Sequence, residues 1–141
     1  MNISNHYKET IVEELKNVAI KMKESNDITD KLYFFSAAFA ILDRIFNLEF
    51  NPTLVLIHMV LQTAYFTISG RVEALIRGQD KVVKIPTGFF DSLQETILDI
   101  ANSISKDDKN ELFKNLQKIA NLSYVTTGNG YYLFQKGMLK I

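Results

Sequence analysis

The fold of this chain is decided by NPTLVLIHMVLQTAYFTISG, residues 51–70, which contains no charged side chain. Asn51 and Pro52 favour a helix start, because Asn caps free backbone amides and Pro fixes φ at the first helical position. The residues that follow are so apolar that the helix needs cover on nearly all sides. The stretch therefore predicts a helix that lies in a core, binds another chain or lies against lipid.

Helical periodicity extends outward from this stretch in both directions. The helix that begins at Pro52 is expected to run over residues 52–77, and Gly78 is its expected stop. Apolar residues at helical spacing predict two earlier helices, over residues 3–25 and 28–48. The first has one charged side, whereas the second is almost continuously apolar.

The two most apolar helices, 28–48 and 52–77, are expected at the centre of the bundle. Ala37 and Ala40 give the helix over residues 28–48 a surface of small side chains, and Gly70 does the same for the helix over residues 52–77. We therefore expect a close crossing of the two helices at Gly70, where a larger side chain would push them apart.

The C-terminal half predicts two further helices, over residues 89–104 and 106–122, with Ser105 as the expected cap of the second. Residues 81–85 suggest a short strand. Residues 123–135 suggest a β-hairpin turning at Gly128-Asn129-Gly130. The predicted fold class is thus mainly α: one domain over residues 1–141, an antiparallel up-and-down bundle of about five helices with a small C-terminal β-hairpin.

Composition excludes several kinds of function. The chain has 141 residues, with 16 basic and 16 acidic side chains, so it has no overall field that would attract nucleic acid. It has no cysteine, which excludes disulfides, thiolate nucleophiles and cysteine metal sites and fits a cytoplasmic location. His6 and His58 are its two histidines, and neither lies in a metal-binding motif. We expect no metal site and no cofactor, and a protein that is not an enzyme.

One polar stripe on the helix over residues 52–77 is a candidate ligand site. Its members share a face because their spacing follows the helical repeat: His58, Gln62, Tyr65, Ser69 and Glu73. The stripe predicts either a polar groove that holds a small ligand, as in a carrier or an enzyme, or the solvated edge of a mostly buried helix.

A basic cluster near the end of the same helix is a candidate anion site. It consists of Arg71, Arg77 and Lys81. Solvated surface charge is the alternative explanation, and Glu73 and Arg77 have the spacing of an intrahelical ion pair.

The C-terminal part resembles the winged-helix family. The expected order is helix 52–77, strand 81–85, helices 89–104 and 106–122, and hairpin 123–135, which resembles helix–strand–helix–helix–wing. The segment GYYLFQKG, residues 130–137, is similar to the last wing strand of many such regulators. The resemblance implies DNA binding through a recognition helix, although the helix over residues 106–122 has mixed charge.

The preferred interpretation is a protein that acts through its surface by self-association, as a homodimer. Residues 28–48 and 52–77 carry more apolar surface than two flanking amphipathic helices normally cover, and a residual apolar patch usually marks an interface.

The uncharged stretch has about the length of a membrane span. We still expect a soluble protein, because polar residues dilute the stretch and no basic cluster flanks its start.

Overall fold

The computed structural model describes residues 1–79 and 85–141, and within these ranges the regular secondary structure consists of six helices and no strands. The mainly α fold class is therefore confirmed. Five of the helices are long and one is short, in the order α1 (Asn5–Glu24), α2 (Ile28–Phe46), α3 (Pro52–Ile76), α4 (Phe89–Ser105), α5 (Lys109–Val125) and α6 (Gly128–Gln135).

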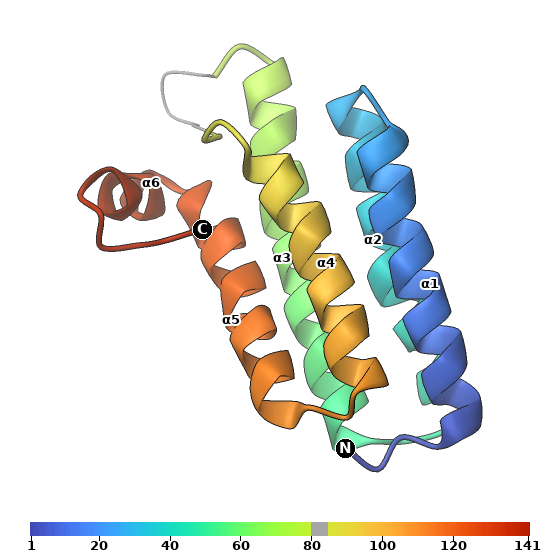
Figure 1. The fold of residues 1–141 in the computed structure, drawn as a ribbon. Helices are drawn as coiled ribbons and strands as arrows, with labels where there is room; N and C mark the ends of the chain where they lie inside the picture. The colour runs from blue at the N-terminus through green and yellow to red at the C-terminus, as the bar shows by residue number, and fades with distance from the viewer. Residues whose placement is uncertain (80–84) are drawn as a thin grey trace.

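The five long helices form a closed ring around one core (Figure 1). α1 packs against α2 and α4, α3 packs against α2 and α5, and α4 packs against α5. Neighbours in the ring run antiparallel, apart from α3 and α5, which run in the same direction. The expectation that residues 28–48 and 52–77 are central is wrong, because α2 and α3 each lie in the ring and keep an outer side.

Local capping explains where α2 and α3 begin. The Asp27 side chain accepts a hydrogen bond from the amide of Thr29 at 2.9 Å. The Asn51 side-chain oxygen accepts from the amides of Thr53 and Leu54. Each bond satisfies an amide that lacks a partner within its helix. Both helix starts are therefore encoded by residues within three positions of the cap.

The turn between α4 and α5 differs from the expectation. α4 includes Ser105, so this residue is not a cap. The cap is Asp108, whose carboxylate accepts a hydrogen bond from the Glu111 amide at 3.1 Å. Asp107, with φ of 55°, makes the reversal between the helices. Asp and Asn adopt this left-handed conformation more readily than most residues.

The predicted C-terminal β-hairpin is wrong, because residues 128–135 form α6. The Thr127 hydroxyl oxygen accepts a hydrogen bond from the Gly130 amide at 3.1 Å, which caps the new helix. The same hydroxyl donates to the Tyr124 carbonyl at 2.6 Å, at the end of α5. One threonine thus joins two helices at a corner. α6 projects from the bundle and packs against α5 (Figure 1).

The winged-helix interpretation required a β-hairpin as its wing, and most of the residues expected to form that hairpin are helical instead. The segment that resembled the last wing strand begins within α6. Residues 81–84 of the expected short strand lie outside the described residues, and Ile85 is not in a strand.

The expected close helix crossing at Gly70 is also wrong. Gly70 is exposed, and an added β-carbon would meet no atom within 4 Å outside its own helical surroundings. The small residues of α2 therefore do not meet α3 at this position.

Candidate functional site

The outward side of α3 carries an uncharged apolar surface. Leu56, Met59 and Phe66 are 39%, 58% and 62% exposed, and Thr63 lies exposed between them on the same side of the helix. We call these four residues the α3 outer face. Large exposed apolar side chains are individually ordinary, but several on one helix face mark a surface that another molecule can cover.

An aromatic cluster between α2 and α3 supports this face. The Phe39 ring of α2 lies 6.3 Å from the Phe66 ring and 5.4 Å from the Tyr65 ring, measured between centroids. Tyr65 also contacts Phe66 at 5.4 Å, and the buried Phe35 at 6.3 Å. These separations are typical of favourable ring pairs. Phe66 therefore packs against two rings although most of its side chain is exposed.

A groove lies between the start of α2 and the end of α3. Its first part has a volume of about 360 Å³, and α2 contributes Thr29, Leu32 and Tyr33 to it. A second part of about 480 Å³ shares Thr29, Val72 and Ile76 with the first and continues over the start of α2. We call the two parts together the α2/α3 groove. α3 lines the first part with Tyr65, Ser69, Val72, Glu73 and Ile76, and the second part adds Asn26, Asp27, Ile28 and Leu75.

The structure divides the predicted polar stripe into two parts. Tyr65, Ser69 and Glu73 line the groove. His58 is instead buried against α2, where its Nε2 lies 3.7 Å from Oδ1 of Asp43 and its ring meets the Phe39 ring edge-on. Gln62 is half-buried between these two parts. The C-terminal half of the stripe therefore belongs to a groove, and its first residue belongs to the contact between α2 and α3.

The predicted anion cluster is spread over different surroundings. Arg77 donates to Oε1 of Glu73 at 2.6 Å, in the intrahelical pair that the spacing indicated. Arg71 is half-buried and lies about 120° from Arg77 around the helix axis. Lys81 lies outside the described residues.

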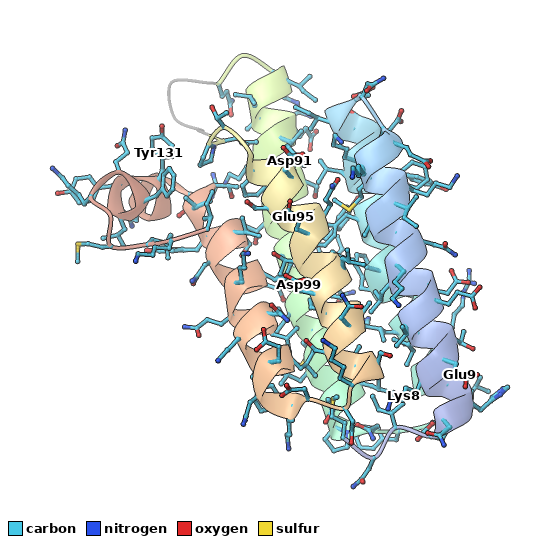
Figure 2. All side chains as sticks on the ribbon, viewed as in Figure 1. Lys8, Glu9, Asp91, Glu95, Asp99 and Tyr131 are labelled. Carbon is cyan, nitrogen blue, oxygen red and sulfur yellow. The ribbon has the colours of Figure 1, made fainter. Side chains whose placement is uncertain are left out.

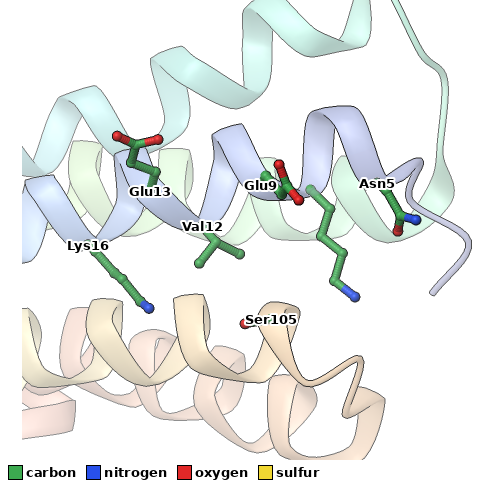
Figure 3. Close-up of a pocket in the computed structure, with 7 residues that line it drawn as sticks. Asn5, Glu9, Val12, Glu13, Lys16 and Ser105 are labelled. Atoms are coloured by element: carbon green, nitrogen blue, oxygen red, sulfur yellow. The ribbon is translucent and has the colours of Figure 1, made fainter.

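A second hollow lies between α1 and α4, and no pattern in the sequence predicted it (Figure 3). It has a volume of about 600 Å³. Lys16 points toward α4 and Glu13 points away from it. The hollow holds equal numbers of acidic and basic residues and lies beside the end of α4, where helix carbonyls attract cations. Sequence periodicity missed it because α1 and α4 are distant in the chain; its lining is Asn5, Lys8, Glu9, Val12, Glu13, Lys16 and Ser105.

The exposed side of α4 is acidic. Asp91, Glu95 and Asp99 recur at every fourth position and lie along one side of the helix (Figure 2). Yet among residues 1–79 and 85–141 no group of three or more His, Cys, Asp or Glu side chains is arranged to hold a metal ion. The acidic side of α4 therefore offers no metal centre.

The length and apolar composition of α3 match those of a membrane-spanning helix. In the bundle its inward residues are buried, including Leu54, Ile57, Leu61 and Ile68. Core helices of water-soluble proteins share this composition, so length and hydropathy alone do not distinguish the two.

Comparison of the chain with models of known families, with curated proteins and with solved structures finds no match. The two surface features that bear on function are the α3 outer face and the α2/α3 groove.

Proposed function

We propose that this protein is a self-associating helical bundle, and that two copies pair through the α3 outer face. The observation that carries the proposal is the exposure of Met59 and Phe66 on a helix side that has no charged residue between Pro52 and Gly70. Removing this apolar surface from water is favourable through the hydrophobic effect. A second copy offers the same surface, as a symmetric dimer requires.

The size of the face suits the centre of an interface. Leu56, Met59 and Phe66 together expose on the order of 300 Å² of apolar surface, which is comparable with the largest patch on many monomers. A standard interface buries about 800 Å² on each partner, with an apolar centre inside a polar rim. Half-buried Gln62, which lies beside Met59 and Phe66 on the same helix, is available for such a rim.

The support beneath the face favours binding. Phe66 packs against Phe39 and Tyr65, so part of its side-chain freedom is already lost before a partner covers it. Aromatic side chains, phenylalanine among them, are enriched at protein interfaces relative to the rest of the surface.

Sedimentation equilibrium at micromolar concentration tests the proposal. We expect a dimer for the unmodified chain and a monomer for Met59→Lys and for Phe66→Glu, because each places a charge in the buried centre. Ile20→Lys is the matched control, since Ile20 is 51% exposed on α1, and it should remain dimeric. A monomeric unmodified chain, or dimers of both outer-face variants, would contradict the proposal.

Lipid is the other medium that can cover an apolar helix side. We propose a soluble chain, because the caps and inward residues of α3 are used within the bundle. After expression and ultracentrifugation without detergent, the chain should stay in the supernatant. Recovery in the membrane pellet would show that α3 meets lipid.

A further inference from the structure

The α2/α3 groove has an apolar floor and aromatic walls. Leu32 and Val72 are buried beneath it, and Ile76 is 69% exposed at its edge. Tyr33, 70% exposed, comes from α2, and half-buried Tyr65 comes from α3. Apolar surface of this kind accommodates a hydrocarbon or aromatic body, and the faces of tyrosine rings also attract cations.

The charged residues of the groove are acidic. Asp27 lines its second part and Glu73 lines its first part. No lysine or arginine is among the described residues that line either part. Arg77 binds Oε1 of Glu73 from outside the lining, so it reduces but does not reverse the negative character. A charged group that enters this groove is therefore favoured when it is positive.

Size is consistent with a small molecule. The overlapping parts of about 360 and 480 Å³ fall within the range of ligand pockets, which is about 300–1,000 Å³. From the apolar floor, the two tyrosine rings and the acidic rim, we propose that the α2/α3 groove binds a small lipophilic cation, with its apolar body on Leu32 and Val72 and its positive group near Glu73 and Asp27.

This inference is independent of the proposed self-association. The groove lies along α3 from Tyr65 onward, whereas Met59 of the α3 outer face lies in the N-terminal half of the helix. Met59→Lys changes the outer face and leaves the groove lining intact. A monomeric protein can therefore still bind the cation, and a dimer can fail to bind it.

Isothermal titration calorimetry with two ions of the same shape and opposite charge tests the proposal. Tetraphenylphosphonium is the cationic probe and tetraphenylborate is the anionic control. We expect one cation per chain, and about tenfold or greater preference for the cation over the anion. Equal or tighter binding of tetraphenylborate, or no measurable binding of the cation at millimolar concentration, would overturn the proposal.

Variants locate the binding. Asp27→Ser combined with Glu73→Gln removes both rim charges while serine still caps α2, and it should weaken cation binding about tenfold. Tyr33→Ser removes one exposed wall of the groove without opening the core, and it should lower the affinity for the cation about fivefold or more. Glu95→Gln on α4 is the matched charge control and should leave affinity unchanged. Circular dichroism verifies the fold of each variant, and unaltered affinity in both groove variants would contradict this site.

Discussion

Gly130 packs against the carbonyl group of Tyr124 so closely that a β-carbon at this position would overlap it. The contact lies at the corner where Thr127 joins α5 to α6. The two nearest atoms belong to the Tyr124 backbone, which cannot move aside as a flexible side chain does. The absence of a side chain at position 130 is therefore a requirement of the corner.

Gly130→Ala is expected to lower the free energy of unfolding by about 1–3 kcal/mol, which is the usual cost of overpacking. Urea denaturation followed by circular dichroism measures it. Gly128→Ala is the matched control, because its added β-carbon would meet nothing within 4 Å. Equal denaturation midpoints for the two variants would show that α6 does not pack on α5 in this way.

Gly70→Ala is expected to raise the free energy of unfolding by up to about 1 kcal/mol, because alanine has the higher helix propensity. Gly70 lies inside α3 with open space around its α-carbon, so the new methyl group meets no obstacle. Urea denaturation again gives the value. Destabilisation would indicate a close neighbour at this position, such as α2 or a second copy.

Asn115 and Ser103 form a buried polar link between α5 and α4. Asn115 Nδ2 donates to Ser103 Oγ at 3.0 Å, and Ser103 in turn donates to the Asp99 carbonyl. Asn115→Ala should lower the free energy of unfolding by about 1–3 kcal/mol, because it removes the hydrogen bond and leaves a cavity. Ser103→Ala should lower it by a similar amount, because it leaves the buried Asn115 amide without its acceptor. The double variant should cost less than the sum of the two. Additive losses in a double-mutant cycle would rule out this coupling.

Asp107 is expected to titrate at low pH. A hydrogen bond from the Met1 amino group at 3.1 Å, and the positive charge of that group, hold the pKa of the Asp107 carboxyl below its ordinary value. The ionised form is thus favoured in the folded chain. Its contribution to stability is present above the unfolded pKa and is lost as the pH falls through the lowered folded pKa. Acetylation of the amino group should raise the Asp107 pKa in an NMR titration, and an unchanged value would contradict the contact.

Prediction from sequence succeeded where the signal was local. Asn51 caps the helix that follows it, as predicted, because a cap depends on its own side chain and on amides two or three residues away. The same rule failed at the C-terminus because Gly128-Asn129-Gly130 suits a hairpin turn as well as a helix start. The close approach of Gly130 to Tyr124 becomes visible only once both helices are placed.

The sequence predicted only the α3 side of the candidate site. Helical spacing grouped Tyr65, Ser69 and Glu73, and the structure finds these three along the groove. Spacing alone did not separate His58 from them, because the difference depends on where α2 lies beside α3. The opposite wall, with Tyr33, was missed for the same reason, since it belongs to a different helix.

Periodicity and capping residues determine that this chain is helical and where most of its helices begin, since these signals act within one or two turns. The order of helices in the ring is a tertiary property, because amphipathic stripes do not specify which stripe pairs with which. That order leaves Met59 and Phe66 of the most apolar helix outside the core. It also brings Tyr33 and Tyr65 to one groove, since two walls on separate helices meet only when the bundle closes.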